Sequence, residues 1–497
     1  MEHSSDSADA NVLSDQPGYF KHPTGSHWMV MHVSCMIVAW VVILPLALIS
    51  FRNRHKIAVQ ITFHVVNGLG IVCSLVYTSQ IPDLYQRNIH KPFSWTISAT
   101  LVIWTMLSWL HTKAKASHPH EKDHATSESS AALYCLANTS DFSLNHSAFK
   151  SSITEHSETS APSSYLDGSI LLPHGLISLL QVTKTSISIL ALPLGFASIM
   201  TGIVTYSGIF RGDHVYSGAA HFIKGGIFFF YGLLTLGRWM GAFLDLGWAW
   251  DCSVTRVKRP GEWFHRMPSA EMVESTVIAV YGASNMFLEH LSGGAWKPSD
   301  VEHLSITILF FGGGLLGILI ECNILPKHGE MSTQRSCTCE NFTTSLQDAF
   351  VASDEAEKSS TSAREAETSA NPMPALVILV LGAVMSSHKQ SSAVATMMHA
   401  QWGPLFGGFA IARLISYTIL VLKPPTAAHG GRLPSELIAA FCLISGGLLF
   451  MASAHDTILV IESSGIEVMA VLTCILGLAS IVMAWEIVVY SLGKRLR

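Results

Sequence analysis

Long apolar runs recur along the whole chain, each about 17–25 residues in length and separated from the next by a short polar break. A helix rises about 1.5 Å per residue, so such a run crosses the ~30 Å hydrocarbon layer of a membrane. The sequence therefore predicts an all-α fold, a polytopic transmembrane helical bundle of about eleven spans. The predicted spans are 29–50, 57–79, 93–111, 186–210, 218–240, 270–291, 303–322, 373–390, 401–422, 434–454 and 466–490.

The composition agrees with a membrane protein. Only 13% of the residues are charged and the mean hydropathy is +0.38, whereas a soluble domain carries about 25% charged residues. The net charge of −5 offers no general basic surface for nucleic acid. The predicted partner is therefore the lipid bilayer, without nucleic acid, and the protein is predicted to be integral and multi-pass, in the plasma membrane or an internal membrane.

Two long polar inserts interrupt the apolar pattern. Residues 112–168 and 323–372 are rich in Ser, Thr, Glu and Lys and poor in aromatic residues, so we predict that both are disordered loops. The stretch 170–185 is apolar but contains Pro173, and it fits either an interfacial helix or an additional short span. The inserts divide the chain into a polar tail at 1–26, a three-span region at 27–111, and a membrane domain whose parts are 169–322 and 373–497.

Lysine and arginine placement predicts the orientation of the bundle. The basic residues of three short loops and of the C-terminus all fall on one side if the chain has eleven spans, and both inserts fall on that side too. This arrangement predicts an outer N-terminus, an inner C-terminus and two inner loops. The basic residues are Arg52, Arg54, Lys56, Arg256, Lys258, Arg259, Arg266, Lys423, Arg432, Lys494, Arg495 and Arg497.

Histidines stand at the ends of the first three spans. His32 and His90 occupy the predicted outer ends of spans 1 and 3, and His55 and His111 occupy inner ends of spans 2 and 3. Two imidazoles at one depth on facing helices can hold a haem b, and an electron path across the membrane needs such a pair near each face. The alternative is that these are histidines of the membrane interface, where a partly polar ring is well accommodated.

The first region resembles the cytochrome b561 family in its pattern of His32, Trp40, Pro45, His55 and Gln60. The resemblance implies haem b ligands and transmembrane electron transfer. The family places a fourth ligand at the inner start of its next helix. At the matching place this chain reads Val-Thr-Lys-Thr at 182–185, without a histidine, so His32 and His90 form the better pair.

A second group of polar residues lies inside the sixth span. Positions three or four apart share one face of a helix, and on this span they form a polar stripe. Ionisable groups within a membrane are costly unless they find partners or water, which points to a functional or packing role. The stripe comprises Glu271, Glu274, Tyr281, Asn285 and Glu289, and its candidate partners on the fifth span are Lys224 and Arg238.

Several motifs resemble the fungal Ytp-type integral membrane proteins. The resemblance implies a b561-like N-terminal region followed by a larger Ytp-like membrane domain, in a family without a settled activity. The motifs are His221-Phe-Ile-Lys-Gly-Gly, Gly237-Arg-Trp-Met-Gly, Gly247-Trp-Ala-Trp, Glu271-Met-Val-Glu-Ser, Leu288-Glu-His290, Met398-His399-Ala-Gln-Trp402 and Ala412-Arg413-Leu-Ile-Ser-Tyr417.

Many histidines and carboxylates fall near the predicted outer face. Imidazole and carboxylate together suit Zn, Fe or Cu ions, and histidines also relay protons. Such residues are also common at loop ends in a chain with 24 histidines. The candidate metal ligands are Glu289, His290, His303 and His399, within a wider outer set that includes His214, His221, His388, His455, Asp456, Glu302 and Glu462.

Three functions remain open from the sequence, and whether the protein is an enzyme is undecided. The first is haem-dependent transmembrane electron transfer through the N-terminal region. The second is a metal-ion or proton-coupled transporter that uses the stripe of the sixth span. The third is a non-catalytic scaffold in which the stripe only holds helices together.

Overall fold

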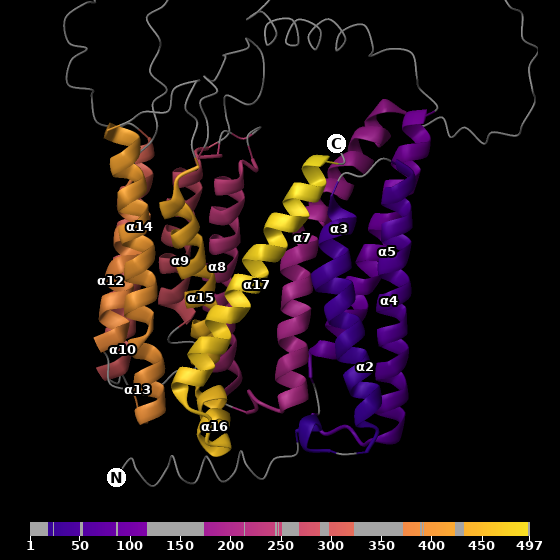
Figure 1. Cartoon of the computed structure of the whole chain (residues 1–497), viewed down its shortest axis with the longest axis horizontal. Coiled ribbons are helices and arrows are strands. Elements are labelled where there is room, and N and C mark those ends of the chain that lie inside the picture. Colours follow the sequence, from indigo (N-terminus) through magenta and orange to yellow (C-terminus); the bar gives the residue numbers. More distant parts are fainter. Residues whose placement is uncertain are drawn as a thin grey trace, which may run out of the picture. The chain divides into compact units, whose positions relative to one another are not determined.

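We describe a computed structural model that places residues 18–116, 173–250, 268–288, 298–322, 371–422 and 432–495, apart from short gaps within these ranges. Every regular element among these residues is helical, which confirms the predicted all-α membrane fold (Figure 1). The chain divides into two compact units. We call residues 17–208 with 491–497 the N-terminal unit, and residues 209–490 the C-terminal unit.

The N-terminal unit contains four long helical segments. Their elements are η1 Tyr19–Lys21, α2 Ser26–Met36, the wider η2 Ile37–Ile43, α3 Leu44–Leu48, α4 Asn53–Gln80, α5 His90–Ala116 and α7 His174–Ser207. The widened turn of η2 directly precedes Pro45, which has no N–H to offer a regular ladder. Helix α2 packs on α4, and α5 packs on α7. The predicted three-span region 27–111 and helix α7 therefore belong to the same unit.

Helix α7 also decides the status of the stretch 170–185. Its residues from His174 onward form the first part of one continuous helix of 34 residues, which includes Pro193. At about 1.5 Å per residue this helix is about 50 Å long, more than one membrane crossing requires. The prediction of an additional short span at 170–185 is therefore wrong, because the residues from His174 onward belong to the same helix as the next predicted span.

The C-terminal unit contains the remaining helices. They are α8 His214–Met240, α9 Ala270–Leu288, α10 Pro298–Glu321, α12 Met373–Ser387, α13 Ala393–Ala400, α14 Trp402–Leu422, α15 Pro434–Ala452, α16 His455–Ser464 and α17 Val468–Arg495. Six of them form a series in which each helix packs on the next, in the order α9, α10, α12, α14, α15 and α8. The series closes where Arg238 of α8 pairs with α9.

Glycines allow two of these helix pairs to approach backbone to backbone. A side chain at Gly447 of α15 would stand 2.5 Å from the backbone nitrogen of Phe229 on α8, and one at Gly225 would stand 2.6 Å from the carbonyl oxygen of Gly447. On α10, Gly314 lies against the backbone of Ala279 in the same way. Small residues are the usual means of close packing between membrane helices.

Nine helical segments of the described residues are long and apolar enough to cross a membrane. The two other predicted spans correspond to α9, which carries two glutamates in its first turns, and to α12, which has 15 residues. The count of eleven and the orientation stay predictions. The inserts and the polar tail lie mostly outside the described residues. The end of the second insert is ordered, however, because buried Asn371 donates to the carbonyl oxygen of Gly317 at 2.9 Å.

Candidate functional site

Five charged side chains meet inside the C-terminal unit. We call Arg238, Glu271, Glu274, Arg413 and Glu436 the buried charge network. They come from α8, α9, α14 and α15, and each is at most 7% exposed. Ion pairs hidden this completely inside a helical bundle exist only where the partners are held in good geometry, because each isolated charge is costly to bury.

Arg238 joins α8 to α9 through a forked contact. One terminal nitrogen, Nη2, donates to Oε1 of Glu271 at 2.7 Å, and the other, Nη1, donates to Oε1 of Glu274 at 2.8 Å. The third donor, Nε, binds the carbonyl oxygen of Trp248 at 2.7 Å. Glu271 and Glu274 can share one guanidinium because residues three apart lie on one face of a helix.

Arg413 joins α14 to three other helices, α9, α15 and α8. Its Nη1 lies 3.5 Å from Oε2 of Glu274, and its Nε lies 3.1 Å from Oε1 of Glu436 on α15. Its Nη2 reaches Oγ1 of Thr235 at 3.4 Å. Glu274 therefore stands between both arginines, whereas Glu436 contacts Arg413 alone among the network's cations.

The chain after α8 folds back to cover the two guanidinium groups. The backbone N–H of Trp250 donates to the carbonyl oxygen of Arg238 at 3.3 Å, and this bond holds the segment against the C-terminal end of α8. The ring of Trp250 then lies 4.6 Å from Cζ of Arg238 and 5.0 Å from Cζ of Arg413. A cation over an indole face is stabilised by about 1–2 kcal/mol when water is excluded.

The network holds three carboxyl groups against two guanidinium groups. Glu436 is fully buried, and neither of its carboxyl oxygens makes a hydrogen bond. The network therefore has one carboxyl group more than its cations can neutralise, which gives it room for one exchangeable proton.

The polar stripe predicted on the sixth span is only partly used in this network. Asn285 instead donates to Oγ1 of Thr307 on α10 at 2.8 Å, and the ring of Tyr281 packs on Phe310 at 5.1 Å. Lys224 is half-buried on α8, 14 residues before Arg238 and so about 21 Å away along the helix. Glu289 lies outside the described residues.

Sequence reasoning did not assign Arg413 and Glu436 to the site. Both carried a usable signal, since each is a charge inside a predicted apolar span, at 401–422 and 434–454. The sequence does not show that they pair with the residues of α8 and α9, because 175 and 198 residues separate them from Arg238.

The predicted haem histidines lie within the N-terminal unit. His32 donates through Nδ1 to the carbonyl oxygen of Gly70 at 2.8 Å, which leaves Nε2 as its other ring nitrogen. Nδ1 of His90 lies 3.1 Å from Oγ1 of Thr201, whose own proton is donated to the carbonyl oxygen of Ser198. The ring of His90 rests against Gly202.

The other predicted pair is less fully described. His111 is half-buried near the end of α5, while His55 belongs to α4 with a side chain outside the described part of the structure. Gln60 of α4 is fully buried, and both polar atoms of its side chain are without a hydrogen-bond partner. A buried amide group whose oxygen and nitrogen both lack hydrogen-bond partners indicates that a further polar group belongs beside it.

Three of the four predicted metal ligands cannot be placed. Glu289 and His290 lie outside the described residues, and His303 belongs to α10 with a side chain outside them. His399 donates through Nδ1 to Ala395 of its own helix at 2.8 Å and packs on Trp402 at 4.3 Å. This metal set stays a prediction.

Two family models match the chain. The model described as "Protein YTP1-like, C-terminal" matches residues 194–494, and a domain of unknown function, DUF2427, matches residues 14–112. No solved structure matches.

Relatives occur in two yeasts. An uncharacterised membrane protein of Schizosaccharomyces pombe is 29% identical over 98% of this chain and 97% of its own length. An uncharacterised membrane protein of Saccharomyces cerevisiae is 34% identical over 59% of this chain and 45% of its own length. Protein YTP1 of the same yeast is 23% identical over 62% and 54% of the two chains.

Proposed function

The chain belongs to the Ytp1-like family of fungal membrane proteins, and we propose that its C-terminal unit is a proton-coupled membrane transporter. The observation that carries this proposal is the buried charge network with its surplus carboxyl group. A network built only to hold helices would be cheapest with equal numbers of each charge, or with apolar side chains of the same volume. A surplus carboxyl group buried among arginines is suited to binding and releasing a proton.

The contacts of Arg413 support a coupling mechanism. When Glu436 is ionised, Arg413 is shared between Glu436 on α15 and Glu274 on α9. When Glu436 takes up a proton, the attraction between Arg413 and α15 weakens and the arginine pairs with Glu274. One proton thereby changes which helices α14 is tied to, and a two-state element of this kind is what proton coupling requires.

Flux measurements test the proposal. The full-length protein is reconstituted into liposomes that contain a pH-sensitive dye, and amino acids, organic acids and divalent metal ions are added outside in turn. We expect one class of solute to change the internal pH with the wild type and not with empty liposomes. Glu436→Gln should lower this proton movement by more than about tenfold, because the amide cannot exchange a proton.

Glu467→Gln is the matched control. Glu467 is an exposed carboxyl group just before α17, in the same unit and outside the network, so its substitution should preserve proton movement. Equal proton movement by Glu436→Gln and the wild type would contradict the proposal. A network whose variants only lower the amount of folded protein would favour the scaffold instead.

A second candidate function, haem-dependent electron transfer, is favoured by the hydrogen bonds of His32 and His90. Both rings direct Nδ1 to a neighbouring oxygen atom, which is the usual way in which a protein orients a histidine whose Nε2 binds a metal. One haem b, if bound by these two histidines, would supply reversible one-electron chemistry. His32 and His90 would hold the group, while Gly70 and Thr201 would fix their rings.

The reduced-minus-oxidised absorption spectrum of the purified protein tests this second candidate. We expect b-type bands with about one haem per chain, and their loss in His90→Ala. His27→Ala, a histidine one turn before His32 without an assigned role, is the control and should retain the bands. A wild type that is free of haem after expression with ample haem would exclude it.

A further inference from the structure

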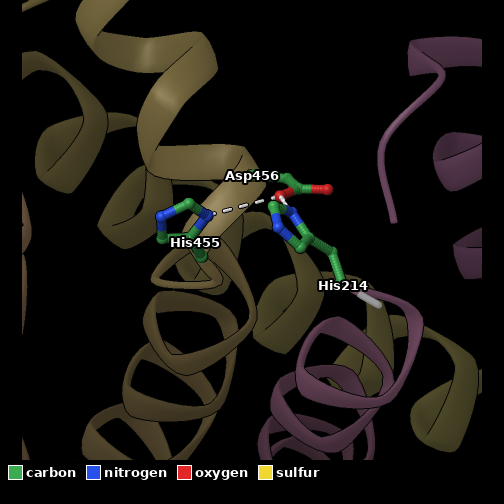
Figure 2. Close-up of side chains that lie close together, drawn as sticks. All are labelled: His214, His455 and Asp456. Carbon is green, nitrogen blue, oxygen red and sulfur yellow. Dashed lines mark hydrogen bonds and ion pairs between the residues drawn. The ribbon is translucent and has the colours of Figure 1, made fainter. Parts of the chain in front are cut away.

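Two histidines and an aspartate come together at the other end of the C-terminal unit. His214 is the first residue of α8, and His455 and Asp456 are the first residues of α16. Figure 2 shows the carboxylate of Asp456 pointing at both imidazole rings. This place lies 24 residues before Arg238 along α8, about 36 Å at helical rise, so it is separate from the buried charge network.

The donor atoms lie within the span of a single metal ion. Oδ1 of Asp456 is 2.6 Å from Nδ1 of His214 and 3.4 Å from Nδ1 of His455. One donor atom from each of the three residues can be chosen so that all lie within 4.8 Å of one another. Ligands of a tetrahedral zinc ion are roughly 3.3 Å apart at bond lengths of about 2.0–2.1 Å. Shifts of about 1 Å would thus bring the three atoms to bonding positions.

The carboxylate is already oriented by its surroundings. The backbone N–H of Phe210 donates to Oδ2 of Asp456 at 2.6 Å, which leaves Oδ1 directed at the histidines. Phe210 has a φ of +60°, a left-handed conformation that is costly for a bulky residue. Its ring is accommodated against Gly218 of α8, where any side chain would collide with it. The structure therefore maintains strained backbone to hold this oxygen in place.

The electrostatics also favour a bound cation. Burial raises the pKa of Asp456, but hydrogen bonds from His455, from the Phe210 N–H and from His214 outweigh this effect, and the pKa lies below its ordinary value. The carboxyl group is 1% exposed, whereas His214 and His455 are 38% and 42% exposed. The site is thus anionic at its base and open to solvent at its rim, as an entering ion requires.

We propose that His214, His455 and Asp456 form a binding site for a divalent transition-metal ion of the zinc class, which fastens α16 to α8. Two imidazoles and one carboxylate are a common ligand set for zinc sites that keep a fourth position for water. A histidine binds a metal ion as neutral imidazole through one ring nitrogen and keeps its proton on the other, so when the ion binds, the hydrogen bond between His214 and Asp456 is replaced by a bond from each residue to the ion. The proposal is independent of proton-coupled transport.

Metal titration of the purified full-length protein tests the proposal. After chelation, Zn²⁺ is added in a calorimeter, and Co²⁺ is added separately to read its coordination from the visible absorption spectrum. We expect the wild type to bind at this site with the intense absorption of a tetrahedral Co²⁺ complex. His455→Ala should weaken binding at the site by about 100-fold or more and remove that absorption.

Two further variants keep the test decisive. The side chain of His455 is 42% exposed, so its removal should not unfold the protein, although it contacts Asp456 at 3.4 Å and the ring of His214 at 5.2 Å. Asp456→Asn keeps the shape of the side chain and removes its charge. His221→Ala is the matched control on α8, since its Nδ1 is directed to Ser217 of its own helix. Wild-type protein without the Co²⁺ absorption, or a wild-type titration reproduced by His455→Ala and Asp456→Asn, would overturn the proposal.

Discussion

The described helices of the N-terminal unit are joined by neutral polar groups, whereas those of the C-terminal unit are joined by neutral groups and also by buried charges. In the first, the indole of Trp40 donates to Asn67 at 3.0 Å, that of Trp104 donates to Ser188 at 2.7 Å, and Ser94 bonds to Ser198 at 3.0 Å. In the second, neutral pairs such as Asn285 and Thr307 are accompanied by the buried contacts of Arg238 and Arg413 with glutamates.

The difference matters because the two kinds of contact fail differently. A lost neutral hydrogen bond costs about 0.5–1.5 kcal/mol, more if a buried group is left unsatisfied. A buried charge that loses its partner costs about 3–5 kcal/mol. The C-terminal unit therefore has far more to lose from a single substitution, and a chain accepts such an arrangement more readily where the charges also do chemistry.

Loss of Arg413 should produce the largest effect. Arg413→Leu leaves Glu436 without its cation and Glu274 with one instead of two, so we expect destabilisation of about 3–5 kcal/mol and little folded protein. Yield and thermal unfolding in detergent measure it. The double variant Arg413→Leu/Glu436→Leu should recover part of the loss, and Arg432→Leu, at an exposed arginine outside the network, should cost far less.

Packing between α8 and α15 should give the next effect. Gly447→Val would force the two backbones apart, with an expected cost of about 1–3 kcal/mol in thermal unfolding. The comparison is Gly68→Ala on α4 of the N-terminal unit, where a side chain would meet nothing within 4 Å. That substitution should be neutral or slightly stabilising, since alanine favours a helix. Equal losses at both glycines would refute the close-packing argument.

Asn67 tests the neutral bonds of the N-terminal unit. It accepts from Trp40 and donates to Ser98 at 3.3 Å, so Asn67→Ala removes two bonds and leaves the buried indole N–H of Trp40 unsatisfied. We expect a cost of about 1–2 kcal/mol, well below that of Arg413→Leu. Thr100→Ala, which removes only a bond within α5, serves as the control. A loss as large as that of Arg413→Leu would remove the contrast between the units.

The smallest effect should come from Tyr19, which precedes the first span. Its hydroxyl donates to Oδ1 of Asp83 at 3.0 Å, and burial together with this carboxylate raises the pKa of Tyr19 above its ordinary value of 10.0. Tyr19→Phe should cost about 1 kcal/mol. The difference from the wild type should be constant below pH 10 and shrink above it, because the unfolded chain ionises first. Tyr216→Phe, at an 80% exposed residue, should show neither effect.

Some of the site was within reach of the sequence. Glu271, Glu274 and Arg238 were recognised as a polar stripe and a partner, because spacing by three or four fixes one helix face. Lys224 was grouped with them by its charge alone, and the length of α8 separates it from Arg238. His214, His455 and Asp456 were noted only as members of a large outer set, since nothing local selects three residues from so many.

The sequence alone determined the membrane class and the helical fold, because the length of an apolar run is a local property that can be compared directly with the thickness of the hydrocarbon layer. Only the tertiary structure decided that Arg413 and Glu436 complete the buried charge network, that α7 joins the N-terminal unit, and that the start of α16 meets the start of α8. These facts depend on which helices are neighbours. Small residues and buried hydrogen bonds or ion pairs select the neighbours, and the residues that make these contacts are far apart in the sequence.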